Sequence, residues 1–283
     1  MEFRNDARPS PIAGTWYTGD PKTLAAQIDG YLEAAKISDD EFYGRAVGLV
    51  SPHAGHRYSG RTAGYAYRVV KDAPRELVVI LSPFHHHVSG DFITTSHASY
   101  QTPLGKVKVA EDTLIELDKK LGEQGHSLIQ VTKDEEHSLE IQLPFLQRAW
   151  NTEFALLPVM VRTHDPGKIQ FFSQALYEVI KGKDFLLVAS TDLSHFYPLD
   201  YAEALDAEML KRIKAFDPEA VLKAETEGSA SACGAGAVAA MLWTARYAGA
   251  EHAYILNYST SADSTGDVSS VVGYGSAAVF TPA

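Results

Sequence analysis

Residues 46–53 read AVGLVSPH and residues 77–85 read LVVILSPFH, two apolar runs that each end in a proline shortly before a histidine. Both runs have the length and apolar content of a buried strand. A third run, FLLVAS at 185–190, leads in the same way to Asp192 and His195. Because ligands of open α/β sheets sit beyond the carboxyl ends of the strands, we expect these polar side chains to meet at one edge.

The rest of the chain alternates helical and strand patterns, which favours the α/β class. Asp20 before Pro21 predicts the start of a helix. The turn at 102–105 predicts a hairpin, flanked by residues 91–95 and 106–110. The other predicted helices lie at about 61–70, 112–121, 139–150, 166–181 and 201–215, and the other strands at 154–161 and 271–280. This pattern predicts a central mixed, largely parallel sheet flanked by helices.

The 283 residues contain no Pro/Gly/Ser-rich linker, repeat or low-complexity block, so a single domain over residues 1–283 is expected. A formal net charge of -11 argues against nucleic acid and an anionic membrane as partners. No apolar run reaches the roughly 18 residues of a membrane-spanning helix. The polar N-terminus lacks the apolar core of a secretory signal, and a cytoplasmic location is therefore expected.

The histidines near strand ends suggest a metal site, since neutral imidazole is a common protein ligand. Such a ring needs a partner on its second nitrogen, and Glu136, Glu140 and Asp192 could supply one. Considered alone, His53 could equally be a loop histidine bonded to the backbone. The histidine triplet at 85–87 could likewise be a solvated loop.

Cys233 is the only cysteine, so no intramolecular disulfide can form. Small residues at 234–240 predict a helix that begins at the cysteine, and a helix N-terminus lowers a thiol pKa toward the thiolate form. A buried, inert cysteine fits the same pattern. With His53 and His85, a thiolate would give two imidazoles and one anionic ligand, a set open to Fe(II), Cu or Zn.

Seven short motifs lie at residues 14–17, 52–55, 82–86, 136–140, 191–195, 232–234 and 256–258. They occur in the order seen in the Memo family, known in bacteria and archaea as AmmeMemoRadiSam system protein B, and the chain resembles that family over nearly its whole length. The resemblance implies an α/β sandwich like that of the class III extradiol dioxygenases (LigB-like). It also implies association with AMMECR1-like and radical-SAM partner proteins.

Residue by residue, the resemblance implies that His53, His85 and Cys233 hold one divalent metal. It implies that Asp192 and His195 line the same pocket and that His195 matches the acid/base histidine of the dioxygenases. We hypothesise that His195, oriented by Asp192, moves a proton. His137, in another family motif, would position the substrate.

Trp16, Phe84 and His86 are expected to line the substrate pocket. The sequence departs from the family pattern at Phe84, where a serine is usual, and at His56, where a tyrosine is common.

Three functions are possible as hypotheses. The first is a non-haem Fe(II)- or Cu-dependent, dioxygenase-like oxidoreductase that acts on an aromatic or phenolic small molecule. The second is a non-catalytic module whose pocket binds a peptide or partner side chain. The third is a zinc hydrolase. The cysteine in place of the dioxygenase glutamate separates this chain from a proven dioxygenase, because thiolate is softer and oxidisable.

Overall fold

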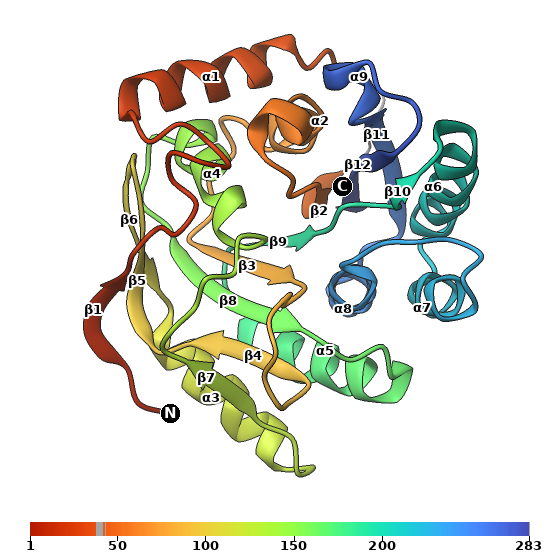
Figure 1. The fold of residues 1–283 in the computed structure, drawn as a ribbon. Helices are drawn as coiled ribbons and strands as arrows, with labels where there is room; N and C mark the ends of the chain where they lie inside the picture. The colour runs from red at the N-terminus through yellow and green to blue at the C-terminus, as the bar shows by residue number, and fades with distance from the viewer. Residues whose placement is uncertain (38–41, 43, 283) are drawn as a thin grey trace.

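Four parallel strands form the centre of the sheet in a computed structural model that describes residues 1–37, 42 and 44–282. They lie in the order β8 (Ala155–Val161), β3 (Leu77–Ser82), β9 (Phe185–Ser190) and β2 (Arg45–Ser51). Nearly every residue in these strands is buried, as expected for a parallel sheet covered on both faces. Their carboxyl ends therefore share one edge, from which the candidate loops emerge (Figure 1).

Parallel and antiparallel strands extend the sheet on both sides. Next to β2 lies β12 (Val271–Thr281), which pairs with β11 (His252–Thr260) and the short β10 (His195–Tyr197). On the β8 side, β6 (Gly105–Val109) forms a hairpin with β5 (His97–Thr102). The remaining strands are β1 (Arg4–Arg8), which is parallel to β5, and β4 (Phe92–Thr95), which pairs with β8 and with β7 (Leu128–Val131). The sheet is thus mixed but largely parallel at its centre.

Helices cover both faces of this sheet (Figure 1). One side carries α1 (Pro21–Ala34), α2 (His56–Val69) and α4 (Leu143–Ala149), and the other carries α3 (Glu111–Gly122), α5 (Pro166–Ile180) and α8 (Ala235–Tyr247). The helices beside β12 and α8 are α6 (Leu199–Lys214) and α7 (Pro218–Glu227). The shortest helical segments are η2 (Glu140–Gln142) and α9 (Ala262–Thr265). This arrangement confirms the predicted fold class.

Several element boundaries differ from those predicted. Asp20 caps α1 as expected, with its side chain accepting from the Thr23 N–H. The predicted helix at 139–150 is divided into η2 and α4, with Pro144 in the first turn of α4, where its missing N–H costs nothing. The strand that precedes the 102–105 turn is β5 rather than residues 91–95, which form β4 in another part of the sheet. The sequence pattern did not predict β5 as a strand.

Within the described residues, no helix is both long enough and apolar enough to cross a membrane.

Candidate metal centre

Three histidines converge at the edge where the central strands end. His53 follows β2, His85 follows β3, and His137 lies in the segment between β7 and η2. One nitrogen from each ring lies within 4.8 Å of a nitrogen from each of the others. The described residues therefore contain a possible three-histidine metal site. Two of its members, His53 and His85, were predicted as ligands, whereas His137 was predicted to position substrate.

His53 is almost completely buried and is fixed on both sides of its ring. Its Nδ1 lies 3.1 Å from Ser190 Oγ, and its Nε2 lies 3.1 Å from Cys233 Sγ. The backbone N–H of His53 donates to Asp192 at 2.7 Å. Burial, and then the charges of His137 and His85, hold the pKa of His53 well below its usual range. The ring is therefore neutral, the form that binds a metal ion.

Glu136 holds the other two imidazoles. Its Oε1 lies 2.9 Å from His85 Nδ1 and 3.3 Å from His137 Nδ1, while its Oε2 accepts the His85 backbone N–H at 2.6 Å. Burial alone would raise the pKa of Glu136, but hydrogen bonds and positive charge from His85 outweigh it and lower that pKa. A carboxylate on Nδ1 is the usual partner that orients a metal-binding histidine. Of the three carboxylates considered from sequence, Glu136 has this role for His85.

The two rings held by Glu136 differ in pKa. Burial would lower the pKa of His85, but its hydrogen bond and charge interaction with Glu136 raise it above the usual value. Burial lowers the pKa of His137 to about 4 despite the same carboxylate. At neutral pH His137 is accordingly an uncharged imidazole with a lone pair available.

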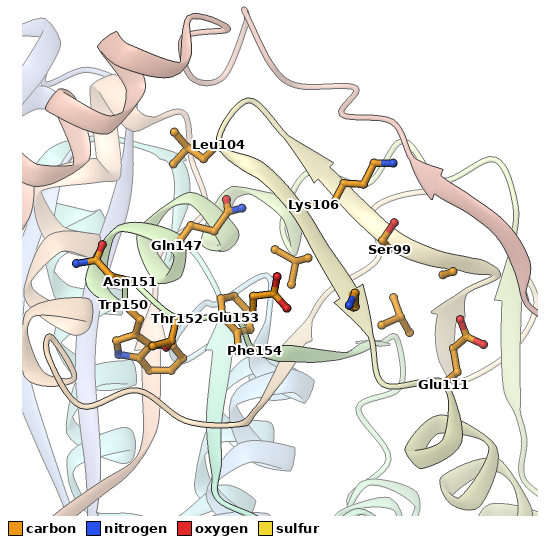
Figure 2. Close-up of a pocket in the computed structure, with 14 residues that line it drawn as sticks. Ser99, Leu104, Lys106, Glu111, Gln147, Trp150, Asn151, Thr152, Glu153 and Phe154 are labelled. Carbon is orange, nitrogen blue, oxygen red and sulfur yellow. The ribbon is translucent and has the colours of Figure 1, made fainter.

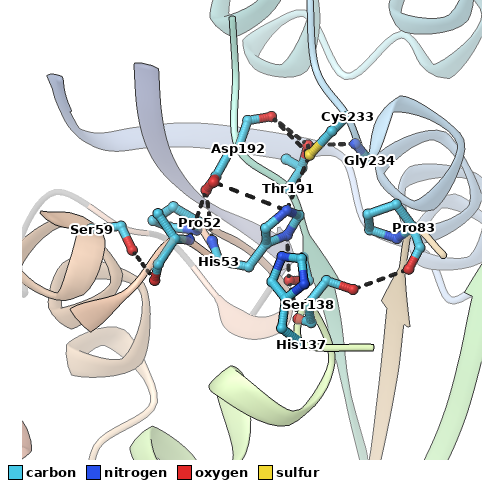
Figure 3. Close-up of polar contacts among 12 residues, drawn as sticks. Pro52, His53, Ser59, Pro83, His137, Ser138, Thr191, Asp192, Cys233 and Gly234 are labelled. Carbon is cyan, nitrogen blue, oxygen red and sulfur yellow. Dashed lines mark hydrogen bonds and ion pairs between the residues drawn. The ribbon is translucent and has the colours of Figure 1, made fainter. Parts of the chain in front are cut away.

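Cys233 lies beside the cluster at the start of α8, as the sequence predicted (Figure 3). Its Sγ contacts His53 Nε2 and lies 3.7 Å from the Asp192 carbonyl oxygen. Burial, followed by the charge of Asp192, raises the pKa of this thiol far above its ordinary value. Burial thus favours the protonated thiol in this arrangement, the opposite of the direction expected from the helix N-terminus.

Asp192 supports the loop that carries His53. Its Oδ1 accepts the backbone N–H groups of His53 at 2.7 Å and Ala54 at 3.2 Å. Burial raises the pKa of this carboxyl to about 7. Within the described residues, its side chain makes no hydrogen bond to His195. The hydrogen bonds of Asp192 go to the His53 loop, and the orientation of His195 by Asp192 stays a prediction.

His195 lies at the start of β10, and its pKa is lowered by burial and then by the charge of His85. Two other residues fix this strand. Asp206 accepts the Ser194 N–H at 2.8 Å, and the Tyr258 hydroxyl donates to Asp206 at 2.8 Å. Tyr258 belongs to a family motif to which the sequence had assigned no role.

The absence of a side chain at Gly273 leaves room for the Asp206 carboxylate. A Cβ built on Gly273 would lie 1.8 Å from Asp206 Oδ2, so a Gly273→Ala variant must push the buried carboxylate aside. We expect a loss of about 1–3 kcal/mol in the free energy of unfolding, measured by chemical denaturation. Gly30→Ala is the matched control, because a Cβ at that helical position meets nothing within 4 Å. Equal stability of the two variants would contradict the prediction.

A cavity of about 470 Å³ opens beside the cluster. Trp16 is one wall and stacks on the His137 ring at 4.0 Å between centroids. Its other lining residues are uncharged: Thr15, Ala54, Gly55, Tyr58, Phe196, Ser261, Thr265, Ser270, Val272 and Tyr274. Trp16 was predicted as a pocket residue. Phe84 and His86, which were predicted with it, are not among the lining residues. Their rings meet edge-on with 5.5 Å between the centroids.

A larger groove of about 770 Å³ lies elsewhere, between β6 and the segment before β8 (Figure 2). Lys106, Trp150 and Glu153 are among its lining residues, and no predicted site residue is. Of the predicted site residues in the described part of the chain, only Trp16 lines the smaller cavity, and its contact with the cluster is the stacking on His137.

His56, one of the two departures from the family pattern, is buried away from the cluster. Its ring stacks on the Tyr17 ring with 5.2 Å between centroids and meets the Phe145 ring edge-on with 5.1 Å between centroids. Burial lowers its pKa to about 4. His56 is therefore a neutral aromatic packing residue.

Comparison with known proteins points to the same family as the order of the sequence motifs. The model of the family described as Memo-like protein matches residues 8–278. The chain belongs to the Memo-like family. A MEMO1 family protein of Nitrosopumilus maritimus is 32% identical over 278 residues, covering 95% of this chain and 98% of the relative. A MEMO1 family protein of Methanopyrus kandleri is 32% identical and covers 94% and 96%.

A solved structure shares the fold of this Memo-like chain. It is the crystal structure of an uncharacterized protein from Escherichia coli K12, with a TM-score of 0.54. The two sequences are 12% identical, and the match covers 82% of this chain and 99% of the other. At this identity the likeness concerns the fold alone.

Proposed function

We propose that this Memo-like protein is a metal-dependent enzyme that acts on an uncharged aromatic or phenolic small molecule. The observation that supports the metal is the cluster of three histidines whose Nδ1 atoms each face a fixed partner. In the proposal the other nitrogen of each ring binds the ion, and a second contact of this kind on Nδ1 is typical of metal-binding histidines. The residues thus fit a divalent metal.

In this proposal His53, His85 and His137 hold the ion, and Cys233 joins them as a thiolate. Fe(II) is the first candidate and Cu or Zn the alternatives, because two or more imidazoles with a thiolate suit all three. When bound, the ion supplies Lewis acidity and, if it is Fe(II) or Cu, redox chemistry. His195 moves a proton to or from the substrate, since burial lowers its pKa and leaves the ring able to accept one. Asp192 supports this site through its hydrogen bonds to the His53 loop.

The cavity beside the cluster favours the proposed substrate class. Its wall is formed by Trp16, Phe196 and other uncharged residues. A flat apolar ring can stack there, whereas a carboxylate or phosphate would meet no cationic side chain among the lining residues.

The first experiment is metal analysis of protein purified without an affinity metal, followed by anaerobic loading with Fe(II), Cu or Zn. Oxygen uptake is then measured over catechols and indoles. We expect uptake with Fe(II) or Cu that is lost in His53→Ala. The absence of uptake with every metal would overturn the redox proposal, and ester or amide cleavage by the zinc form would indicate a hydrolase instead.

Ligation by Cys233 predicts that metal affinity depends on pH. The thiol pKa is raised, so the metal-free protein holds this proton at neutral pH and must release it to bind an ion through sulfur. Metal affinity should therefore rise with pH by up to about tenfold per unit, with about one proton released per ion. Titration calorimetry in buffers of different ionisation enthalpy measures the release. A Cys233→Ala variant that releases the same proton would contradict thiolate ligation.

A second function is favoured by three exposed aromatic residues, of which Phe196 lines the cavity. Phe196, Tyr197 and Tyr201 are 75%, 41% and 54% exposed, and such residues are common in protein interfaces. In that case the cavity receives a peptide or partner side chain without turnover. AMMECR1-like and radical-SAM proteins are the partners to test by co-purification. A pure binder would keep its partner in His53→Ala and Cys233→Ala variants.

We also propose that residues 1–283 are one domain, which predicts a single cooperative unfolding transition. A cytoplasmic location stays a prediction.

A further inference from the structure

We propose that Ser190 and Gln142 set the tautomer of His53, so that its Nε2 carries a lone pair toward the metal position. Both residues act through His53 and are positioning residues. Their effect on metal binding rests on the proposed function, whereas the tautomer rests only on hydrogen bonds among buried side chains. Ser190 and Gln142 are both completely buried, so no solvent competes for these contacts.

The side-chain amide of Gln142 has only one satisfactory orientation. Its Oε1 accepts from the Tyr67 hydroxyl at 2.8 Å, and its Nε2 donates to the Pro52 carbonyl at 3.0 Å. A reversed amide would bring its oxygen against the Pro52 carbonyl oxygen, two acceptors without a proton between them. The Nε2 therefore also donates to Ser190 Oγ, at 2.7 Å.

The hydrogen bonds of Ser190 in turn determine which nitrogen of His53 carries the proton. A hydroxyl has one proton and two lone pairs. Ser190 donates its proton to the Ser138 carbonyl at 2.6 Å and accepts from Gln142 with one lone pair. Its second lone pair remains for His53 Nδ1, 3.1 Å away, which must then carry a proton.

This tautomer leaves Nε2 of His53 without a proton. Nε2 is the nitrogen that faces Cys233, 3.1 Å from its Sγ, so in this tautomer Nε2 can accept the thiol proton (Figure 3). An ion at the cluster needs that lone pair, and the opposite tautomer would direct a proton at the ion. Loss of the hydrogen-bond partner that fixes the tautomer of a metal-binding histidine typically lowers metal affinity about 10–100-fold.

The decisive measurement is the tautomer of His53 in the metal-free wild-type protein at neutral pH. Long-range ¹H–¹⁵N NMR distinguishes a protonated Nδ1 from a protonated Nε2, and His53→Gln assigns the ring. We expect a proton on Nδ1 only. A proton on Nε2, or on both nitrogens, would overturn the proposal, and this result does not depend on any metal or activity.

Ser190→Ala tests the consequence. We expect a mixture of tautomers and about 10–100-fold weaker binding of Zn(II) or Fe(II), measured by chelator competition. Ser173→Ala is the control. The Ser173 side chain is also buried and its hydroxyl hydrogen-bonds backbone carbonyl oxygens, but it belongs to α5 and, among the described residues, makes no hydrogen bond to the cluster. If Ser190→Ala kept the wild-type tautomer and affinity, Ser190 would have no positioning role. Failure of wild type to bind metal would reject the proposed function, whereas the tautomer measurement would still stand.

Discussion

A His137→Ala variant is expected to bind Fe(II) or Zn(II) at least about 100-fold more weakly than the wild-type protein. The reason is that His137 is one of the three imidazoles that lie within ligand distance of one another. Loss of a residue that hydrogen-bonds a metal ligand already lowers metal affinity about 10–100-fold, and loss of the ligand itself should lower it more. Metal content after dialysis and chelator competition give the affinity.

His164→Ala is the control, because His164 is an exposed histidine just beyond β8 at the same edge of the sheet. It should keep wild-type affinity. The comparison with Cys233→Ala decides between ligand sets. If His137→Ala retained full affinity while Cys233→Ala lost it, the metal would be held by His53, His85 and Cys233 without His137.

The edge of the sheet at which the site forms could be predicted from the sequence because buried parallel strands have a clear local pattern. The buried runs before His53, His85 and Asp192 became β2, β3 and β9, which lie side by side and parallel. The loops after parallel strands emerge at the same edge of the sheet, so the local pattern was enough to bring these residues together.

The contacts inside the site were less predictable, because they depend on loops and on burial. His137 follows no central strand, and only the path of the segment after β7 brings it beside His53. Ser190 and Gln142 carry no sequence signal beyond being polar residues in apolar surroundings. The raised pKa of Cys233 depends on how completely the fold removes it from water, which the helix start alone did not reveal.

The early residues of the chain support the site through a buried charge network. Arg8 pairs with Asp134 at 2.6 Å and with Glu140, and it donates to the Glu136 carbonyl at 2.5 Å. Asp134 also accepts the Glu136 N–H at 2.9 Å. The backbone of Glu136 is therefore held from both sides, and its carboxylate is the group that orients His85.

An Arg8→Met variant is expected to lose about 3–5 kcal/mol of unfolding free energy, since it leaves buried carboxylates without their cation. Arg148→Met is the control. The Arg148 guanidinium binds Asp29 with two nitrogens, but this pair is partly exposed and its loss should cost less than about 1 kcal/mol. Denaturant unfolding in the presence of chelator separates this effect from metal binding.

The pH dependence of the Arg8→Met deficit gives a second check. Burial raises the pKa of Glu140 even with Arg8 present, and removing the cation should raise it further. A carboxyl whose folded-state pKa exceeds its unfolded value destabilises the protein as pH rises through that window, because the folded state then holds the extra proton. The deficit should therefore shrink as pH falls from 7 toward the ordinary glutamate pKa of about 4.3. A deficit that stays constant or grows on acidification would mean that Arg8 acts through packing and not through its charge.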